Sequence, residues 1–587
     1  MSASSGWYEI GPFVGAAGVL HLLPFVPALV SPLPVSPLFP LCVDALVLCS
    51  VAMLTYDTRF EHLGIGIASV GLGGVLLYQI YDALVYSAFG RSGLLYDDLQ
   101  YVVDLLYFAR DSASLVTVVG MVGGTLALVA VGWSLPRLMR VVARGRVHAT
   151  CRWSIGAVHL VAWPLVLVIA PWQQWGPENL TYQTSNERVR VRTVAGKASE
   201  NVQASMRMRG MLDSLRTVPV DSTYARYDSL RWSRRPNLFL LMIESYGEVL
   251  HRHPDLRAPY HDMMRRLESD LSADGWHSAS AWSDAAVRGG RSWLAIASVF
   301  LGTRVGHQLL YEQFQAHPER PPHLIRFLNR QGYRTLTLQP YMKARPGLPV
   351  GNPYGFDVTL YRNDLPYEGP PYGWGFVDVP DQWSLGYAHD KHIAPATQPV
   401  FLFFETVLSH ALWNYGVPPV LPDWTAFAAS STAASIRQLA QETGNDASAL
   451  LPDSLTAPRI VDQPTPQRFL RHIAYEWMVM RWYLQTKIPP NSLVIVMGDH
   501  QPPLLPTETF GVPVHVLSRD AALVEPFRMD GYVPGLHPEG APRRTHAGLY
   551  AEWVRAITRA NGSPRDALPP RKPAGVAPSI LTPAMGP

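Results

Sequence analysis

Five long apolar stretches in the first 173 residues constrain the fold of this chain more than any other feature. Each is rich in Leu, Val, Ala and Gly, is almost free of charge, and has roughly 18–25 residues, the length that a bilayer core requires. The stretches are Ile10–Val30, Leu38–Tyr56, Leu63–Ser87, Ala113–Leu135 and Trp153–Trp172. The sequence therefore predicts an N-terminal transmembrane bundle of five helices over residues 1–173.

Charged residues in and around these stretches indicate how the bundle is built and oriented. Asp44 and Asp82 interrupt two stretches and should face the protein interior, where hydrogen bonding between helices is favoured over a functional role. Positive charge stays on the cytoplasmic side of a membrane. The loop between the fourth and fifth stretches carries five arginines, which are Arg137, Arg140, Arg144, Arg146 and Arg152. Everything after Trp172 is therefore expected outside the cytoplasm, in a multi-pass protein of the cell (inner) membrane.

A basic connector over residues 174–235 follows the apolar region. A helix that lies on anionic lipid headgroups and a solvated linker helix fit its pattern equally well. Its basic residues include Arg188, Arg190, Arg192, Lys197, Arg207 and Arg209. The whole chain has a net charge of +3 and only 16% charged residues, and it carries no nucleic-acid-binding motif. Its 3 cysteines all precede residue 152, which excludes a disulfide framework or a cysteine zinc site in the long C-terminal part.

Residues 236–560 alternate apolar strands with helical segments. Strands are predicted at Asn237–Ile243, His277–Trp282, Tyr333–Leu338, Pro399–Val407, Leu493–Met497 and Val512–Leu517. Helices are predicted at Tyr260–Ala273, Ser292–Leu301, Leu324–Arg330, Phe469–Gln485 and Ala547–Ala560. This alternation, with unbroken apolar strands, indicates an α/β domain with a mostly parallel central sheet covered on both faces. Ala428–Pro466 is interpreted as a surface insertion, and the Pro-rich residues 561–587 as a disordered tail.

Two of the predicted strands end in side chains that suit a metal ion. One buried strand stops at Gly498 and is followed at once by Asp499 and His500, and Asn237–Ile243 is followed by Glu244. Open α/β sheets bind their ligands at the carboxyl ends of the strands. Carboxylates and one imidazole suit a single divalent ion, Mn²⁺ or Zn²⁺, whereas Mg²⁺ fits less well because of the histidine. For the Asp-His pair taken alone, a turn in which the aspartate caps a helix is favoured.

Ser292 opens a helical segment directly after two glycines, in the run RGGRS at residues 288–292. Glycines allow close backbone approach, and the free N–H groups of a helix N-terminus attract phosphate or sulfate. A metal held by the side chains at the strand ends, and bound directly by the Ser292 oxygen, would lower the pKa of the hydroxyl and make it a nucleophile. Arg291 or Arg288 would pair with the phosphoryl group, although both can equally be surface arginines. For the serine alone, a helix N-cap is favoured.

His410 follows the apolar strand that is predicted over Pro399–Val407. A histidine at a strand end beside a metal can protonate a leaving group or hold a phosphoryl oxygen. For a lone histidine, a hydrogen-bonded loop residue is the favoured explanation. The prediction of a catalytic site therefore depends on the ordered set of motifs and not on any single one.

The order of these motifs resembles that of a known superfamily. The set comprises strand–Glu–Ser–x–Gly at Glu244, Gly-Gly-Arg-Ser at Ser292, strand–x–His at His410 and Gly-Asp-His at His500. It resembles the extracytoplasmic sulfatase-like enzymes of the alkaline phosphatase superfamily, and most of all the lipoteichoic acid synthase type with its phosphoglycerol and phosphoethanolamine transferase relatives. The resemblance covers roughly residues 236–530 together with the membrane layout.

The resemblance implies a sulfatase-like fold and a role for each of the site residues. Glu244, Ser292, Asp499 and His500 would bind one divalent metal. Ser292 would be the nucleophile, and His410 would contact the substrate.

The sequence departs from this group at the nucleophile. The lipoteichoic acid and phosphoethanolamine enzymes generally use threonine where this chain has Ser292, and a primary hydroxyl can perform the same chemistry. Sulfatases that make formylglycine need a C/S-x-P-x-R motif, and Ser292–Ile296 lacks its proline and arginine, so sulfate-ester hydrolysis by that route is not expected. Pro380–Gln382 and Val514–Val516 also resemble segments of the group, and packing alone explains them.

Together these inferences predict a membrane-anchored, metal-dependent phosphotransferase. Ser292 would attack the phosphorus of a phospholipid donor, diacylglycerol would leave, and a phosphoserine intermediate would pass phosphoglycerol or phosphoethanolamine to an envelope glycan or lipid acceptor. Two alternatives stay open. One is an extracytoplasmic phosphodiesterase or sulfatase-like hydrolase that uses water as the acceptor, and the other is an inactive anchor that binds envelope polymer or a partner protein.

Overall fold

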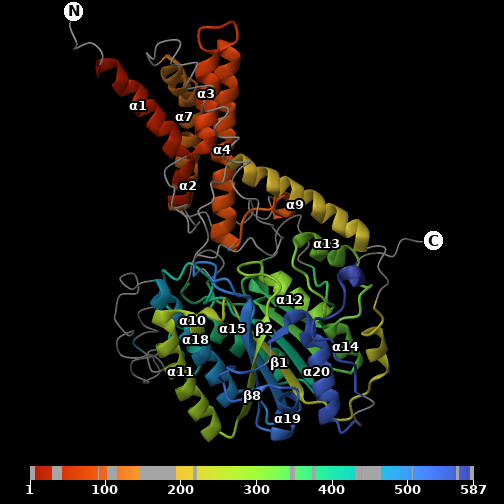
Figure 1. Cartoon of the computed structure of the whole chain (residues 1–587). Coiled ribbons are helices and arrows are strands. Elements are labelled where there is room, and N and C mark those ends of the chain that lie inside the picture. Colours follow the sequence, from red (N-terminus) through yellow and green to blue (C-terminus); the bar gives the residue numbers. More distant parts are fainter. Residues whose placement is uncertain are drawn as a thin grey trace, which may run out of the picture. The chain divides into compact units, whose positions relative to one another are not determined.

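The chain forms two compact units in a computed structural model. Unit 1 comprises Met1–Leu99 and Ala113–Arg209, and unit 2 comprises Gln100–Ser112 and Gly210–Pro587. Many of the elements of both units are labelled in Figure 1. The structure describes residues 7–29, 42–89, 91–101, 115–144, 194–215, 221–343, 351–372, 378–429, 438, 465–505, 507–541, 543–563 and 568–581.

Unit 1 is helical, and two of its helices are long and apolar enough to cross a membrane, which suggests membrane anchoring. These spans are Glu61–Phe89 and Val118–Arg144. The helices that lie wholly or mainly in this unit are α1 (Trp7–Leu22), η1 (Leu23–Phe25), α2 (Val26–Leu29), α3 (Val43–Thr55), α4 (Glu61–Phe89), α5 (Leu95–Asp98), α7 (Leu115–Arg144) and α9 (Val194–Leu215); η2 (Leu99–Tyr101) begins at its boundary.

The prediction of five membrane spans was wrong for the described residues, which contain two such helices. The first predicted span is divided into α1, η1 and α2, and Pro24 lies at the start of η1. The second is described from residue 42 on, and there α3 covers 13 residues. Proline lacks the N–H that continues a helix, which accounts for the interruption at Pro24. The predicted fifth span, Trp153–Trp172, lies outside the described residues.

Asp44 and Asp82 are both buried in unit 1, as expected for carboxylates within apolar stretches. Asp44 Oδ2 accepts a hydrogen bond from the Val194 N–H at 2.7 Å. Asp82 Oδ1 accepts one from the Gly93 N–H at 2.9 Å, and its Oδ2 lies 3.4 Å from Lys197 Nζ. These contacts satisfy both carboxylates, and they tie the first turn of the connector helix α9 to the rest of unit 1.

A nine-stranded sheet forms the centre of unit 2, in the order β4-β3-β5-β1-β6-β7-β2-β8, with β9 paired to β2. The strands from β4 to β6 in this order are parallel, whereas β7 is antiparallel to both of its neighbours. The prediction of a mostly parallel α/β sheet is therefore confirmed. The strands are β1 (Asn237–Ile243), β2 (His277–Asp284), β3 (Arg334–Gln339), β4 (Val358–Tyr361), β5 (Val400–Glu405), β6 (Ser492–Gly498), β7 (Gly511–Ser518), β8 (Val533–Pro534) and β9 (Arg543–Thr545).

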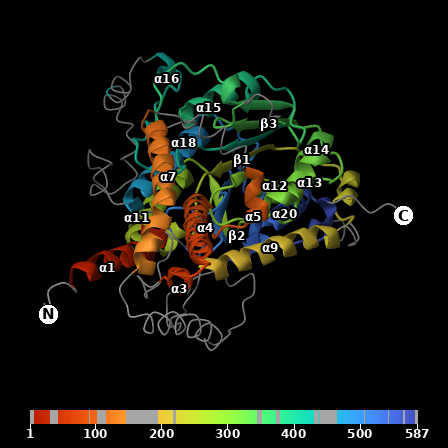
Figure 2. The ribbon, with the colours of Figure 1, turned by 90° about the horizontal axis from the view of Figure 1, so that it is seen from above.

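Helices cover both faces of this sheet (Figures 1 and 2). Helices α11, α15 and α18 lie on one face, where the rings of Phe239 and Tyr483 are 5.9 Å apart. Helices α12, α14 and α20 lie on the other, where Phe300 and Phe403 are 5.0 Å apart. The helical elements of unit 2 are η3 (Ala225–Ser229), α10 (Val249–Arg252), α11 (Pro254–Ala273), α12 (Ser292–Leu301), α13 (Gln308–Ala316), α14 (Leu324–Arg330), η4 (Arg362–Asp364), α15 (Asp381–Ala388), η5 (His389–Ile393), α16 (Ala426–Ala429), α18 (Thr465–Thr486), α19 (Ala521–Met529), α20 (His546–Ala560) and η10 (Pro578–Leu581).

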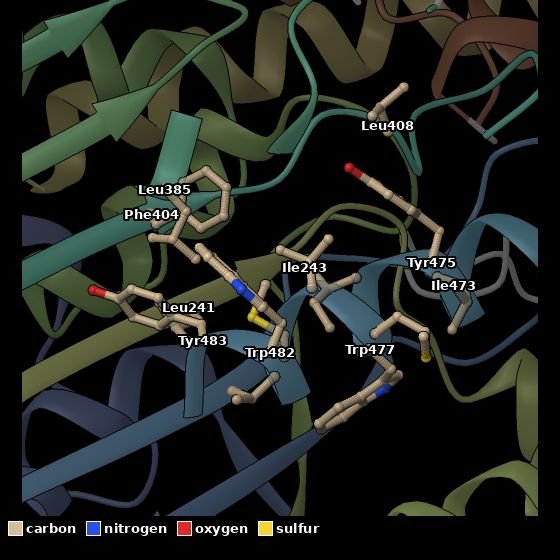
Figure 3. Close-up of a cluster of buried hydrophobic side chains, with 14 of the residues drawn as sticks. Leu241, Ile243, Leu385, Phe404, Leu408, Ile473, Tyr475, Trp477, Trp482 and Tyr483 are labelled. Atoms are coloured by element: carbon tan, nitrogen blue, oxygen red, sulfur yellow. The ribbon is translucent and has the colours of Figure 1, made fainter. Parts of the chain in front are cut away.

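The core on the α18 face is shown in Figure 3, where Leu241 and Ile243 of β1 lie among aromatic side chains of α18. Leu241 is 0% exposed. Leu241→Ala is expected to lower the free energy of unfolding of unit 2 by about 2–5 kcal/mol, because it leaves a cavity in close-packed surroundings. Met529→Ala, at a side chain 65% exposed, should change it by less than about 0.5 kcal/mol. Chemical denaturation followed by tryptophan fluorescence measures both values, and equal losses would contradict the packing described.

The prediction of a disordered tail over residues 561–587 does not hold for residues 568–581. Val576 forms a bridge with Thr303, and its N–H donates to the Gly302 carbonyl at 2.8 Å. Ile580 and Leu581 of η10 are buried. The few apolar residues of this proline-rich run thus pack against the domain, a contact that composition alone does not reveal. Most of the predicted insertion Ala428–Pro466 lies outside the described residues.

Candidate metal-dependent active site

The parallel strands bring the candidate site residues together at the carboxyl end of the sheet. Strands β1 and β6 are parallel neighbours, with Ile243 level with Gly498, so Glu244 and Asp499 emerge side by side at the carboxyl end of the sheet. Strand β5 pairs with the other edge of β1, which brings the segment after Glu405 to the same end. The side chains that the sequence analysis assigned to strand ends therefore lie at the same end of the sheet.

Four of the predicted site residues converge within hydrogen-bonding or ion-pairing distance. Ser292 Oγ lies 2.9 Å from Glu244 Oε2 and 3.2 Å from His500 Nε2. His500 Nε2 lies 3.1 Å from Asp499 Oδ2 and 3.7 Å from Glu244 Oε1. Ligands of a tetrahedral Zn²⁺ with bonds of about 2.0–2.2 Å lie about 3.3–3.5 Å apart. The spacing of these donor atoms therefore fits a bound divalent ion.

The hydrogen bonds around the cluster leave the metal-facing atoms free to bind. His500 Nδ1 lies 2.9 Å from the Gln501 carbonyl, which can only accept, so the proton resides on Nδ1 and the Nε2 lone pair faces the cluster. Asp499 Oδ1 accepts from the N–H groups of Ser245 at 2.8 Å and His500 at 2.6 Å. Its Oδ2 is buried and has no hydrogen-bond partner among the described residues. Such an oxygen is the kind that a cation satisfies.

The electrostatics of the site also favour a cation. Burial raises the pKa of Glu244, but its electrostatic interactions with His500 and His410, together with hydrogen bonds, outweigh burial and lower the pKa to about 2. Burial, followed by the charges of Glu244 and Glu405, raises the pKa of Asp499 well above its usual value. Three carboxyl groups are thus crowded into a buried site, and a divalent ion would offset the cost of ionising them.

His410 and Arg291, the predicted substrate-binding residues, lie at the border of this cluster. His410 is partly buried and interacts electrostatically with Glu244. Burial lowers the pKa of His500, and His410 contributes to the same shift. Arg291 precedes α12 in a left-handed conformation, with φ of 60°, and is 6% exposed. The carbonyl of Arg288 accepts the Gln501 N–H at 2.8 Å, which joins the RGGRS loop to the Asp-His loop. Contact of His410 and Arg291 with a substrate stays a prediction.

Glu405 was not predicted from the sequence, although it belongs to this site. It is the last residue of β5 and fully buried, and burial, followed by the charge of Glu244, raises its pKa to about 8. Gln339 Nε2 donates to its Oε2 at 3.2 Å, and the Tyr341 hydroxyl donates to the same oxygen. A carboxylate at the end of an otherwise apolar strand was the signal that could have revealed it.

A buried pair of carboxyl groups supports the loop that carries His410. Asp381 accepts the N–H groups of Val407 at 3.0 Å and Leu408 at 2.9 Å. Burial raises the pKa of Asp381 to about 7, and burial, followed by the charge of Asp381, raises that of Glu476 well above its usual value. Pro380–Gln382, for which a packing role was predicted, thus supports this loop through Asp381. The raised pKa values indicate that the pair of Asp381 and Glu476 holds at least one proton at neutral pH.

Glu476→Gln is expected to flatten the pH dependence of stability. Unfolded carboxyls ionise near pH 3.8 and 4.5, whereas the folded pair keeps a proton to about pH 7 or above. The contribution of the protonated pair is therefore complete below about pH 4 and is lost as the pH rises through 7. Between pH 5 and 8, the melting temperature of the wild type should fall relative to that of Glu476→Gln.

The control for this experiment is Glu525→Gln, at an exposed glutamate of α19. Its melting temperature should follow the wild-type slope. Parallel pH profiles for wild type and Glu476→Gln would show that the pair is ionised in the folded protein.

The fold and the cluster together define a mixed, mostly parallel α/β unit with a buried site fit for one divalent metal beside a serine hydroxyl. No family model matches the chain, and no curated protein matches it. The chain is structurally similar to solved members of the alkaline phosphatase superfamily, the group that the sequence resembles.

Three of these structures illustrate the similarity. The lipoteichoic acid synthase LtaP from Listeria monocytogenes has 14% identity and a TM-score of 0.35, over 64% of this chain and 81% of that one. An alkaline phosphatase superfamily protein from Vibrio parahaemolyticus has 12% identity and a TM-score of 0.37, over 64% and 78%. The Streptococcus pyogenes phosphoglycerol transferase GacH has 11% identity and a TM-score of 0.32, over 60% and 86%. Because the TM-scores are below 0.5, the function proposed below rests on the geometry of the site.

Proposed function

We propose that this chain is a membrane-anchored, metal-dependent phosphotransferase. It would move a phosphoglycerol or phosphoethanolamine headgroup from a membrane phospholipid to an envelope glycan or lipid acceptor. The observation that supports it is the convergence of a serine hydroxyl with two carboxylates and an imidazole, in which Ser292 Oγ lies 2.9 Å from Glu244 and 3.2 Å from His500. A partly exposed hydroxyl at the start of a helix, with its neighbours buried, is the arrangement that a nucleophile requires.

The residues of the chain have distinct tasks in the proposed reaction. Glu244, Asp499 and His500, together with Ser292, would hold Mn²⁺ or Zn²⁺, which supplies Lewis-acid stabilisation of negative charge when bound. Ser292 Oγ, which donates a hydrogen bond to Glu244 Oε2 in the structure, gives its proton to that carboxylate and attacks the phosphorus. A new O–P bond forms, and the P–O bond to diacylglycerol breaks. His410 donates a proton to the departing oxygen.

In the second half of the reaction the acceptor hydroxyl gives its proton to His410 and attacks the phosphoserine. The Ser292 O–P bond breaks, the Ser292 oxygen takes its proton back from Glu244, and the headgroup passes to the acceptor. Arg291, at the N-terminus of α12, would balance the charge of the phosphoryl group, as would the N–H groups of that helix end. Water in place of the acceptor would make the protein a hydrolase.

The membrane placement belongs to the same proposal. The two long apolar helices of unit 1 suggest an anchor, and Arg137, Arg140 and Arg144 gather at the C-terminal end of α7. The positive-inside rule favours that end on the cytoplasmic side, which supports an extracytoplasmic position for unit 2 in a multi-pass protein of the inner membrane. The donor phospholipid would then be available in the same membrane.

Transfer and hydrolysis can be separated with a phospholipid labelled in its headgroup. The full-length protein is incubated with this lipid in the presence and absence of envelope glycan, and the products are followed together with the mass of the protein. Label on Ser292 that moves to the glycan is the expected result. Free headgroup in equal amounts under both conditions would identify a hydrolase. An unmodified Ser292 with no product, in a protein that binds no metal, would identify an inactive anchor.

A further inference from the structure

A second group of metal-binding side chains lies in unit 2, outside the proposed active site. His251 belongs to α10, His261 to α11, and Glu539 to the loop between β8 and β9. His251 Nδ1 and His261 Nε2 are 3.2 Å apart. Glu539 Oε1 lies 3.5 Å from that nitrogen of His261 and 4.0 Å from that nitrogen of His251. One donor atom of each residue therefore faces the same point.

These separations fit a tetrahedral metal site. Bonds of about 2.0–2.1 Å at tetrahedral angles place neighbouring ligand atoms about 3.3–3.4 Å apart, close to the observed 3.2 and 3.5 Å and somewhat below 4.0 Å. His251 Nδ1 and His261 Nε2 can share one proton in the hydrogen bond between them, so one of the two nitrogens keeps its lone pair. The Glu539 carboxylate beside them is then close to that lone pair. A cation at their common point satisfies all three donors at once.

The surroundings hold His251 in place, whereas the side chain of Glu539 is 54% exposed. The ring of His251 lies edge-on between Tyr260 at 4.8 Å and Trp282 at 4.7 Å, and its side chain is 5% exposed. The loop that carries Glu539 is anchored where it begins, because the Leu536 N–H donates to Glu268 Oε2 at 3.0 Å. Rigid support of this kind lowers the cost of ordering the ligands when the metal binds.

A fourth donor lies beside the cluster. The rings of His537 and His261 are 5.2 Å apart. His537 Nε2 is buried and has no hydrogen-bond partner within the described part of the chain. This unpartnered nitrogen is therefore a candidate fourth ligand for a site that has two imidazoles and one carboxylate.

We propose that His251, His261 and Glu539 form a second divalent-metal site, with Zn²⁺ as the best-fitting ion and His537 as its fourth ligand. Imidazole and carboxylate ligands in tetrahedral array select zinc among the common ions. The site has a structural role, since it connects α10 and α11 to the loop between β8 and β9.

The test counts zinc ions on the full-length protein in detergent, after chelation and re-equilibration with Zn²⁺. Elemental analysis should find two ions per wild-type chain and one in Asp499→Asn, His261→Gln and Glu539→Gln. The double variant Asp499→Asn/His261→Gln should hold none. Loss of a direct ligand should weaken zinc binding at the second site by at least about tenfold. His317→Gln, at an exposed histidine beside Glu319, is the matched control and should keep both ions.

Asp499→Asn isolates the second site for two further measurements. Zinc should raise the melting temperature of this variant, and added Glu539→Gln should remove most of that rise. Co²⁺ in the same variant should give the intense visible absorption of a four-coordinate site. Asp499→Asn protein that binds no zinc would overturn the proposal, as would an unchanged zinc count and affinity in both His261→Gln and Glu539→Gln.

Discussion

Replacing Ser292 with alanine is expected to abolish covalent labelling of the protein by a headgroup-labelled phospholipid and to slow headgroup transfer by at least about a thousandfold. The variant keeps the helix and the three neighbouring candidate ligands but loses the oxygen that would form the bond to phosphorus in the proposed reaction. Intact-protein mass spectrometry measures the label, and product analysis measures the rate.

Two further variants make this result specific. Ser292→Thr retains a hydroxyl at the same position and should retain labelling, at a rate reduced by the added methyl group. Ser272→Ala, at an exposed serine of α11, should behave as the wild type. Wild-type labelling of the Ser292→Ala protein would show that another residue is the nucleophile.

Chelation of divalent metal is the second change with a large expected effect. If the proposed reaction takes place, chelation should lower the transfer rate by at least about a hundredfold, because an ionised Ser292 and the phosphoryl oxygens would lose their main source of charge stabilisation. Added Mn²⁺ or Zn²⁺ should restore the rate, and whichever does so at the lower concentration identifies the better ion. Asp499→Asn should reproduce the loss, because Asp499 Oδ2 is the buried oxygen that has no hydrogen-bond partner among the described residues.

The stability of the metal-free protein gives a readout that does not depend on activity. Without the ion, the burial of Asp499 beside Glu244 costs free energy, because the Asp499 carboxyl must take up a proton that it does not hold in the unfolded chain at neutral pH. Asp499→Asn should therefore melt at a higher temperature than the chelated wild type. Asp262→Asn, at an exposed carboxylate of α11, should not differ from the wild type in melting temperature.

For the activity measurement, full activity in thoroughly chelated protein would rule out a metal-dependent reaction.

The parts of the fold that could be predicted from the sequence are those with a strong local pattern. Helices α12 and α14 begin and end at the predicted residues, and the six predicted strands all exist within one or two residues. The short strands β4, β8 and β9 have four, two and three residues, too few to show a hydrophobic period, and they exist because the neighbouring strands offer free edges. The membrane spans were overcounted because apolar composition does not register the prolines that divide them.

Some residues of the site could be identified from their neighbours in sequence, whereas others are brought together only by the tertiary fold. Glu244, Asp499 and His500 follow buried strands directly, and Ser292 follows two glycines, so each could be identified from its neighbours in sequence. Glu405 was hidden within an apolar strand. Asp381 and Glu476 belong to helices whose patterns do not indicate that the two carboxyls face each other, and the His251 cluster depends on a loop more than 270 residues away in sequence.

The interleaved order of the sheet also determines when the active site can exist. Strand β1 lies between β5 and β6, and Ser292 meets His500 across 208 residues of sequence. A nascent chain therefore exposes Glu244 and Ser292 long before the ribosome has made Asp499, and an incomplete chain cannot capture the ion. A divalent ion that needs all four side chains could therefore bind only after His500 has been synthesised and β6 has joined the sheet.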